Sequence, residues 1–588
     1  MTKHQSFKGR DWEQPRPAQA DVDALIKEGA PKAVAGVLAV RGFDPKDYED
    51  FKAPKLRNLL PEPFRFKDME KGVNRIAEAI VKDEKIGIWS DYDVDGATSA
   101  GILGWFLRMS GHDRFTVRVP DRIAEGYGPN GKGLREMRDD LGCDVICILD
   151  SGTLAFDALA EAKEAGIDIV VIDHHAAEEE LPEAVAVINP NRKDEEPGYG
   201  HLCAAGMVFI FTIAMARKLR KDGYYTNGTP DLMELLDMVA LGTVADVVPL
   251  TGLNRAFVHA GLPYLSRRMR PGIAALCLAA GMPPKKPVTS GDCGWVLGPR
   301  INAGGRIGES DSGSLMLLEE DKDEAKRLAE HLNKLNGERQ EIEAACTEMA
   351  MADIGPRENG DRSLVMAVTD SHEGVVGISA SRLKDAFDAP SIVLTNTPEG
   401  TLKGSARSVK GFDIGHAIIS ARQAGLIEKG GGHGMAGGLT LTRAQMKPFK
   451  EFMDAEIKKT DYWKDGIVTR ADFALGMADL TVDLIEGFGG MAPFGTGNPE
   501  PLVVLENVEI SEIRVLKEKH LKLVLKSRGR KVDGLFWGVA QGAIGTMIRE
   551  HQGMMVDVLC KAEINEFRGE RNPQVIIQDI RVTGSGLL

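Results

Sequence analysis

The chain has 588 residues, a formal net charge of −14 and 43% hydrophobic residues. This length is enough for several domains, and the composition is ordinary for a globular protein. We find no apolar run long enough to cross a bilayer and no apolar signal-peptide core, which predicts a cytoplasmic protein. Seven scattered cysteines without a Cys-x-x-Cys pair argue against structural zinc and disulfides. The negative charge argues against indiscriminate coating of nucleic acid, but it leaves room for a locally basic groove.

Residues 1–80 are expected to form a helical and loop-rich lead-in, with prolines near positions 15, 45 and 61. From about residue 84, short apolar runs alternate with helical patterns. Strands are expected in "KIGIWS", "FTVRVP", "DVICILD" and "DIVVID". Short β-rich runs separated by helices predict a parallel sheet with crossover helices. In such a sheet, ligands bind beyond the carboxyl ends of the strands.

Acidic and imidazole side chains follow three of these strands, in "DYDVDG", "LDSG" and "VIDHH", and "VADVVPL" adds a fourth cluster. Like charges this close raise one another's pKa, and a bound cation is the usual compensation. Carboxylates and imidazoles without cysteines suit Mn²⁺ or Mg²⁺, and two such ions can clamp both oxygens of a phosphoester displacement. The residues of this acidic edge are Asp91, Asp93, Asp95, Asp150, Asp173, His174, His175 and Asp246.

A single aspartate after a strand is more often a turn or helix cap than a ligand, by about four to one. Three clusters at equivalent strand ends of one predicted sheet favour a metal site, since caps do not require that coincidence. Asp150, at the end of the third run, is the candidate for a carboxylate that bridges two ions.

The remainder of the chain divides into three patterns. Residues 321–352 form a long charged helical pattern without proline, which indicates a connector between two lobes. A second alternating segment covers roughly 361–459. From about 462 onward short strands predominate, which predicts a small barrel or sandwich. Alternation in "HLKLVLK" places Lys522 and Lys526 on one strand face, as in oligonucleotide-binding folds, while Phe536 and Trp537 are either a base-stacking surface or core.

The motifs "SDYDVDG", "LDSG", "DHH" and "GTVADVVPL" resemble the successive motifs of the DHH phosphoesterase superfamily. Further segments are similar to the RecJ family of single-strand-specific exonucleases, which digest DNA from the 5′ end. These segments, in order, are "RIAEGYG", "LCAAGMVF", "LGPRINAGGRIG", "LNGERQEIE", "HEGVVGISASRLK", "GSARS", "GGGHGMAGG" and "APFGTGNPEP". The resemblance covers roughly residues 80–580, and the ordered series is far more specific than the letters DHH.

The resemblance implies an α/β fold of several parts. They are a lead-in (1–80), a DHH-type parallel-sheet catalytic domain (81–318), a long connecting helix (319–355), a second α/β DHH-associated domain (356–460) and a C-terminal OB-like β-barrel that binds nucleic acid (461–588). One departure from the family is Ser90, where many relatives carry glycine.

The resemblance also implies roles for individual residues. Two divalent ions, Mn²⁺ or Mg²⁺, are expected on Asp91, Asp93, Asp95, Asp150, His174 and Asp246, with Asp91 either a ligand or just behind one. Catalytic roles are expected for His175, Asp150 and Asp93. Contacts with the DNA strand are expected from Arg122, Asn302, Arg306, Ser405, Arg407 and His433, with Arg407 and Ser405 anchoring a 5′-terminal phosphate.

The implied activity is 5′-to-3′ hydrolysis of phosphodiester bonds in single-stranded DNA, in recombination and repair. Candidate protein partners are a single-strand-binding protein and a helicase, and no membrane is expected. One alternative is a DHH phosphodiesterase that acts on short oligonucleotides or small nucleotides, which usually lacks the C-terminal barrel. Another is a DNA-binding replication scaffold without activity, which is expected to lose metal ligands that this chain keeps.

Overall fold

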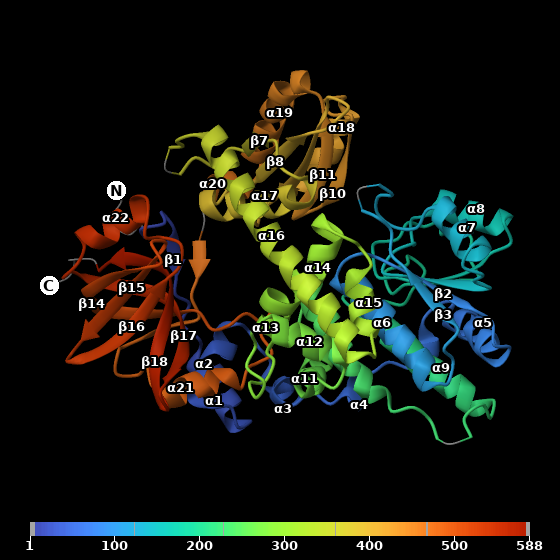
Figure 1. Ribbon diagram of the computed structural model, residues 1–588. Helices are drawn as coiled ribbons and strands as arrows, with labels where there is room; N and C mark the ends of the chain where they lie inside the picture. Colours follow the sequence, from blue (N-terminus) through green and yellow to red (C-terminus); the bar gives the residue numbers. More distant parts are fainter. Residues whose placement is uncertain (1–5, 123, 227, 359, 466–467, 584–588) are drawn as a thin grey trace. The chain divides into compact units, whose positions relative to one another are not determined.

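The computed structural model describes residues 6–122, 124–226, 228–358, 360–465 and 468–583 (Figure 1). It contains two compact units. Unit 1 comprises residues 1–52, 341–492 and 500–588, and unit 2 comprises residues 53–340 and 493–499. Within the described ranges, every helix is too short or too polar to span a membrane.

Unit 2 is built on a five-stranded parallel sheet. Its strand order is β3 (Phe115–Arg118), β2 (Ile86–Ser90), β4 (Val145–Leu149), β5 (Asp168–Ile172) and β6 (Ala186–Ile188). The first four are the strands predicted from the sequence. β6 was not predicted, because it is only three residues long and shows no alternation that would mark it as a strand.

Helices cover both faces of this sheet, which explains why β2 and β4 are apolar and buried along their whole length. Ile86 and Ile88 of β2 pack with one helical layer, and Trp89 packs with the other. The first layer contains α5 (Met69–Val81), α6 (Val94–Met109) and α9 (Ala204–Lys221), and the second contains α7 (Gly131–Asp139) and α8 (Phe156–Glu164) (Figure 1). The carboxyl ends of the strands therefore open onto one edge between the two layers.

The rest of unit 2 is helical. Its elements are α4 (Leu56–Leu59), α10 (Leu236–Ala245), α11 (Gly252–Arg267), α12 (Pro271–Ala279), α13 (Ser290–Asp292), a π-helical turn (Cys293–Leu297), α14 (Gly298–Ile307) and α15 (Ser312–Leu318). The predicted connecting helix is α16 (Lys322–Ile354), which is 33 residues long. The division between the units falls within it, after Gln340.

Unit 1 contains a second α/β sheet, as predicted. Its strand order is β10 (Lys429–His433), β11 (Ala436–Leu441), β9 (Leu402–Arg407), β8 (Ser391–Asn396) and β7 (Val365–Thr369). Only β7 and β8 are parallel, and the other pairs are antiparallel. The accompanying helices are α17 (Glu373–Phe387), α18 (Ile414–Gln423), α19 (Met446–Lys458) and α20 (Asp461–Asp465).

The C-terminal part of unit 1 is a closed five-stranded barrel, so the prediction of an OB-like barrel is confirmed. The strands are β14 (Val503–Leu516), β15 (His520–Ser527), β16 (Arg530–Phe536), β18 (Glu570–Val582) and β17 (Met555–Phe567), and β17 pairs back onto β14. β13 (Phe473–Leu475) adds to β14, and α21 (Val482–Gly489) and α22 (Ala543–Glu550) accompany the barrel. Full closure leaves few unpaired strand edges.

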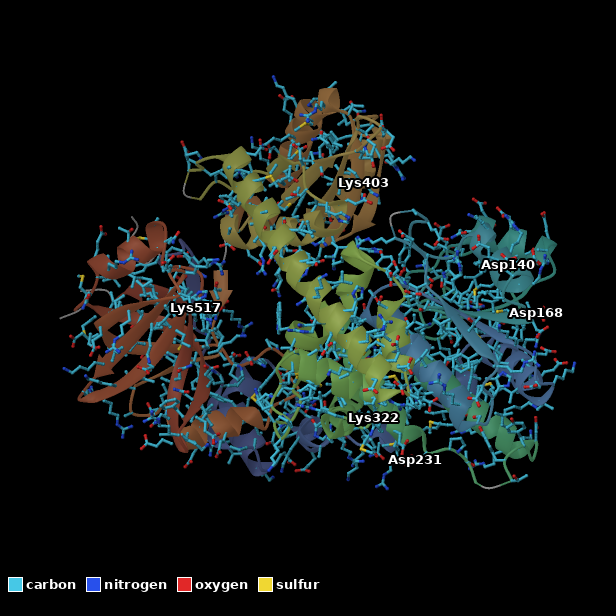
Figure 2. The ribbon with its side chains drawn as sticks, viewed as in Figure 1. Asp140, Asp168, Asp231, Lys322, Lys403 and Lys517 are labelled. Carbon is cyan, nitrogen blue, oxygen red and sulfur yellow. The ribbon has the colours of Figure 1, made fainter. Side chains whose placement is uncertain are left out.

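The alternation predicted for β15 is confirmed. Its leucines, such as Leu523, are buried, whereas Lys526 is exposed and Lys522 is partly exposed in an ion pair of 2.7 Å with Asp533. Lys517, labelled in Figure 2, is exposed in the turn before β15. Phe536 belongs to the core and Trp537 is 52% exposed, so the core alternative holds for Phe536 alone.

The lead-in contains α1 (Gln19–Lys27), α2 (Lys32–Val40), α3 (Tyr48–Lys52) and one strand that was not predicted, β1 (Asp11–Glu13). β1 pairs with β12 (Val468–Arg470), so its partner lies more than 450 residues later and leaves no local pattern in the sequence. Arg10 donates two hydrogen bonds to Asp388, and the Trp12 indole donates one to Asp579, which fix the first part of the lead-in within unit 1. Residues 53–80 of the lead-in, with α4 and most of α5, belong to unit 2 instead.

Candidate active site

The first acidic motif lies at the turn between β2 and α6. Asp91 is buried at the end of β2, and Asp93 is the N-cap of α6, where its Oδ1 accepts hydrogen bonds from the amides of Asp95 (2.9 Å) and Gly96 (3.1 Å). A Cβ at Gly96 would lie 2.4 Å from the Asp91 carbonyl oxygen, so only glycine fits here. The cap uses one carboxylate oxygen of Asp93, and the other is left for a ligand.

Asp95 and Asp150 are buried behind this turn. The two carboxylate oxygens of Asp95 accept hydrogen bonds from the amides of Ala204 (2.6 Å) and Ala205 (2.9 Å) at the start of α9. Asp150 directly follows β4 and has a φ of +60°, a conformation in which aspartate is more tolerated than most residues. Its Oδ1 has no hydrogen-bond partner among the described residues.

Asp173, at the end of β5, organises the histidine pair. Its Oδ1 accepts hydrogen bonds from the amides of His174 (2.7 Å) and His175 (3.2 Å) and lies 2.8 Å from His175 Nδ1, while its Oδ2 accepts from the Thr153 amide (3.0 Å). Asp173 is 1% exposed. We therefore assign it to orienting the histidines, because its two oxygens contact four nitrogen atoms, twice as many as the oxygens of Asp95.

His174 lies at the centre of the cluster. Its Nδ1 is 3.1 Å from the Leu202 carbonyl oxygen, which makes Nδ1 the protonated nitrogen and leaves a lone pair on Nε2. That Nε2 lies 3.3 Å from Asp150 Oδ1, 3.8 Å from Asp95 Oδ2 and 3.8 Å from Asp246 Oδ2. Asp246 follows the last residue of α10, and its Oδ2 is buried without a hydrogen-bond partner among the described residues.

Burial and crowding shift the pKa values of these carboxyls upward. Burial and the nearby charge of Asp93 raise the pKa of Asp91 well above its ordinary value. Burial and the nearby charge of Asp95 likewise raise the pKa of Asp150 well above its ordinary value. Burial, Asp95 and Asp93 raise the pKa of Asp246 to about 9. In each case a nearby cation would favour the ionised carboxylate.

Hydrogen bonding has the opposite effect at Asp173. Burial alone would raise the pKa of Asp173, but the hydrogen bond and charge of His175 hold it well below the ordinary value. Burial would likewise lower the pKa of His175, but the bond to Asp173 raises it. The contrast separates carboxyls that are satisfied within the protein from those that are not.

The acidic edge fits divalent cations. Three groups each offer ligand atoms within 4.8 Å of one another: Asp91 with Asp93 and Asp150, Asp95 with His174 and Asp246, and Asp150 with His174 and His175. Asp91 Oδ1, Asp150 Oδ1 and Asp246 Oδ2 are buried oxygens without hydrogen-bond partners among the described residues. Buried carboxylate oxygens of this kind are costly unless a positive charge accompanies them.

Tyr127 is a site residue that the sequence analysis did not single out. Its hydroxyl lies 3.1 Å from His175 Nε2 and donates a 3.3 Å hydrogen bond to the Asp150 carbonyl oxygen. Its ring lies edge-on to those of Tyr92 and His175. The only sequence signal was its place in "RIAEGYG", where the arginine drew attention instead.

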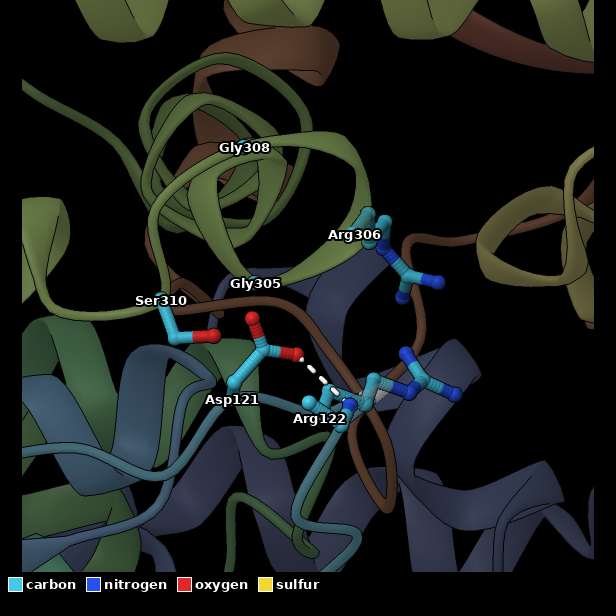
Figure 3. A pocket seen from close by; sticks show the side chains of 7 residues that line it. Asp121, Arg122, Gly305, Arg306, Gly308 and Ser310 are labelled. Atoms are coloured by element: carbon cyan, nitrogen blue, oxygen red, sulfur yellow. Dashed lines mark hydrogen bonds between the residues drawn. The ribbon is translucent and has the colours of Figure 1, made fainter.

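Arg122 and Arg306 line one pocket of about 210 Å³ (Figure 3). The Arg122 guanidinium lies 5.0 Å from the centre of the Tyr92 ring, and Figure 3 shows both guanidinium groups extending to the same side of the pocket. A Cβ at Gly305 would lie 2.8 Å from Tyr92 Cβ, so this glycine lets α14 approach the first acidic motif. The two arginines are therefore brought together beside the acidic edge.

Asn302 lies on α14, four residues before Arg306. Its Oδ1 is buried and has no hydrogen-bond partner among the described residues. The neighbouring Arg300 instead donates to Asn333 Oδ1 (3.0 Å) and to the Val296 carbonyl oxygen (2.7 Å). Arg300 is thus engaged in the packing of α14.

The three remaining predicted residues lie in unit 1. Arg407 is the last residue of β9 and lies opposite Ala436 of β11. On the other side of β11, Ala436 lies opposite His433 of β10. The Arg407 guanidinium donates hydrogen bonds to Ser405 Oγ (2.9 Å) and to the Ala406 carbonyl oxygen (2.8 Å). Arg407, Ser405 and His433 are therefore grouped at one end of this sheet, and His433 is exposed.

Three protein-family models match the chain. The DHH family N-terminal domain matches residues 85–243, the DHHA1 domain residues 360–459, and the RecJ OB domain residues 471–579. Their order agrees with the parallel-sheet unit, the second sheet and the barrel.

Similar curated proteins carry the name single-stranded-DNA-specific exonuclease RecJ. One from Bacillus subtilis is 32% identical over 97% of this chain and 71% of its own length, and one from Salmonella typhimurium is 32% identical over 96% and 98%. A crystal structure of RecJ from Thermus thermophilus in complex with Mn²⁺ matches 98% of this chain and 80% of that chain, with a TM-score of 0.77 and 26% identity. On this agreement of sequence, domain order and fold, the chain belongs to the RecJ family.

Proposed function

We propose that the chain is a metal-dependent exonuclease that hydrolyses single-stranded DNA from its 5′ end, in DNA recombination and repair. One observation carries this proposal. His174 Nε2 lies 3.3 Å from Asp150 and 3.8 Å from both Asp95 and Asp246, while buried carboxylate oxygens of Asp91, Asp150 and Asp246 lack hydrogen-bond partners among the described residues. Such a cluster suits a multiply charged cation and is difficult to explain by folding alone.

Two ions of Mn²⁺ or Mg²⁺ would be held by Asp91, Asp93, Asp95, Asp150, His174 and Asp246. When bound, such ions activate water and offset the charge that develops on phosphorus oxygens. The RecJ structures from Thermus thermophilus with Mn²⁺ and with Mg²⁺ support this choice of ions. Asp150, shared by two of the three ligand groups, is our candidate for the bridging carboxylate.

His175 is the candidate for proton transfer. Asp173 fixes its Nδ1, and the Tyr127 hydroxyl lies against its Nε2, so the ring is held in one orientation. Its pKa, raised by Asp173 against the effect of burial, favours a protonated imidazole. We propose that Nε2 holds the proton required by the leaving oxygen or contacts the phosphate directly.

Arginine and amide groups would hold the strand. Arg122 and Arg306 in the pocket of unit 2, together with Asn302, offer donors for phosphate oxygens. Arg407, Ser405 and His433 in unit 1 are proposed to anchor the 5′-terminal phosphate, which would set the direction of digestion. The exposed lysines and Trp537 of the barrel offer a surface for single-stranded DNA.

The restriction to single strands and to DNA rests on the names of the relatives. The cytoplasmic location, and partnerships with a single-strand-binding protein and a helicase, stay predictions.

The test uses the full chain and single-stranded DNA labelled at either end. We expect release of label from the 5′ end first, strict dependence on Mn²⁺ or Mg²⁺, and much slower digestion of blunt duplex. Digestion that begins at the 3′ end, persists in excess chelator, or proceeds equally on duplex would contradict the proposal.

A further inference from the structure

Residues 493–499 within "APFGTGNPEP" have no role in the function proposed above. This segment, Pro493–Pro499, packs as part of unit 2, although the chain on both sides of it belongs to unit 1. Its contacts within unit 2 concentrate on residues 249–255, which follow Asp246.

The segment folds into a tight turn of its own. The amide of Gly495 donates to the Asn498 carbonyl oxygen (3.0 Å), and the amide of Asn498 donates back to the Gly495 carbonyl oxygen (3.1 Å). The Asn498 side chain, 5% exposed, donates a 2.9 Å hydrogen bond from Nδ2 to the Pro493 carbonyl oxygen. Asn498 thereby ties the end of the turn to its start.

Backbone and side-chain contacts attach this turn to the loop after α10. The Leu250 amide donates to the Thr496 carbonyl oxygen at 2.7 Å. A Cβ at Gly497 would lie 3.3 Å from both the Pro249 Cβ and the Thr251 Cγ2, so the two segments are in direct contact. The fit leaves little room for the loop to shift.

Two further hydrogen bonds hold the segment on unit 2. The guanidinium of Arg255, which is 3% exposed, donates to the Pro493 carbonyl oxygen at 3.2 Å. The Ser290 hydroxyl donates to the Phe494 carbonyl oxygen at 2.7 Å. A buried arginine bonded to a backbone carbonyl is a costly arrangement to keep for a mere linker.

The loop that is held carries a strained residue next to Asp246. Val247 has a φ of +61° and is 67% exposed, and a β-branched residue rarely adopts this conformation. Such strain is unfavourable and persists only where the surroundings impose it. The Leu250 amide bond to Thr496 and the Asn254 side-chain bond to the Pro249 carbonyl oxygen (3.1 Å) are such constraints.

We propose that the 493–499 segment is a positioning element for Asp246, so that the affinity of the acidic edge for divalent metal depends on it. The segment fixes the loop 249–251, the loop imposes the turn at Val247, and the turn aims the Asp246 carboxylate at His174. This inference rests on the proposed function in one respect, the role of Asp246 as a metal ligand.

The test measures the affinity of the full chain for Mn²⁺. Electron paramagnetic resonance reports the concentration of free Mn²⁺ during the titration. Asn498→Ala is expected to weaken Mn²⁺ binding about 10-fold, the lower end for loss of a group that supports a metal ligand. The Mn²⁺ concentration for half-maximal nuclease activity should rise by the same factor, while the rate at saturating Mn²⁺ stays within about two-fold. If Asn498→Ala fails to fold, Ser290→Ala is used, and loss of its one neutral hydrogen bond is expected to weaken Mn²⁺ binding about three-fold.

The matched control is Ser110→Ala, which removes a 2.9 Å hydrogen bond with the Tyr225 hydroxyl at the carboxyl end of α6 in unit 2. It should lose some thermal stability and keep the parent Mn²⁺ affinity. Parent-like Mn²⁺ affinity in the folded Asn498 or Ser290 variant, alongside lost affinity in Asp246→Ala, would overturn the inference and leave the proposed function intact. Parent-like affinity in Asp246→Ala would overturn the assignment of Asp246 and this inference with it.

Discussion

The two α/β sheets of this chain both end in groups of polar residues, and the groups differ in charge and in how their hydrogen bonds are completed. In unit 2, buried oxygens of Asp91, Asp150 and Asp246 lack partners among the described residues. In unit 1, Arg407 already donates to Ser405 and to a backbone carbonyl. The comparison indicates that the first group is built around a cation, whereas the second is stable by itself and offers a positive charge to an anion.

The comparison predicts the largest effect at Asp150. Asp150→Ala should lower the rate of 5′ nucleotide release about 1,000-fold or more, because several kcal/mol of transition-state stabilisation depend on the bound metal. The measurement is single-turnover digestion of labelled single strands at saturating Mn²⁺, with folding checked by circular dichroism. Full activity would remove Asp150 from the site.

A smaller but still large effect is expected at His175, which lies in the same cluster but is hydrogen-bonded to Asp173. His175→Ala should lower kcat about 100-fold or more, in the range for loss of a general acid, while Mn²⁺ affinity stays close to that of the parent. His416→Ala, at an exposed position of α18, is the control. A His175 variant that loses Mn²⁺ and activity together would make His175 a ligand instead.

The polar group of unit 1, formed by Arg407, Ser405 and His433, should affect the choice of substrate more than the rate of hydrolysis. Arg407→Ala should lower kcat/KM on 5′-phosphorylated strands about 10- to 100-fold, the equivalent of one hydrogen bond to a charged group. Strands with a 5′ hydroxyl should be affected much less. Arg443→Ala, an exposed arginine of the same unit, is the control. Equal losses on both substrates would argue against an anchor for the terminal phosphate.

The last expected effect is on stability rather than on activity. Since the pKa of Asp246 is raised to about 9 in the folded chain, from an ordinary value of 3.8, its contribution to stability is fully present below about pH 4 and is lost as the pH rises toward 9. Without metal, the unfolding temperature should therefore fall over this range, and less steeply in Asp246→Asn. Added Mn²⁺ should raise the unfolding temperature more at pH 8 than at pH 5.

Differential scanning calorimetry in chelator, compared with added Mn²⁺, measures this effect. Asp231→Asn, at an exposed helix cap, is the control, and its curve should run parallel to that of the parent. Identical pH profiles for the parent and Asp246→Asn would contradict the electrostatic account.

Much of the fold was predictable because its signals are local. Buried strands such as Ile86–Ser90 are continuous apolar runs, and each predicted ligand cluster follows a strand or helix end. What the sequence did not reveal depends on long-range contacts. β1 pairs with β12, which lies more than 450 residues later, and the 493–499 segment packs beside Leu250. Tyr127 was missed because an aromatic residue in a glycine-containing loop has no chemical signature until His175 is placed against it.

The most direct test of the central claim is a crystal structure of the full chain soaked in Mn²⁺, with anomalous diffraction data. We predict anomalous peaks among Asp91, Asp93, Asp95, Asp150, His174 and Asp246, with the Asp150 carboxylate in contact with more than one of them. Anomalous density elsewhere, or none at these residues when Mn²⁺ is saturating, would contradict a metal-dependent active site at this edge of the sheet.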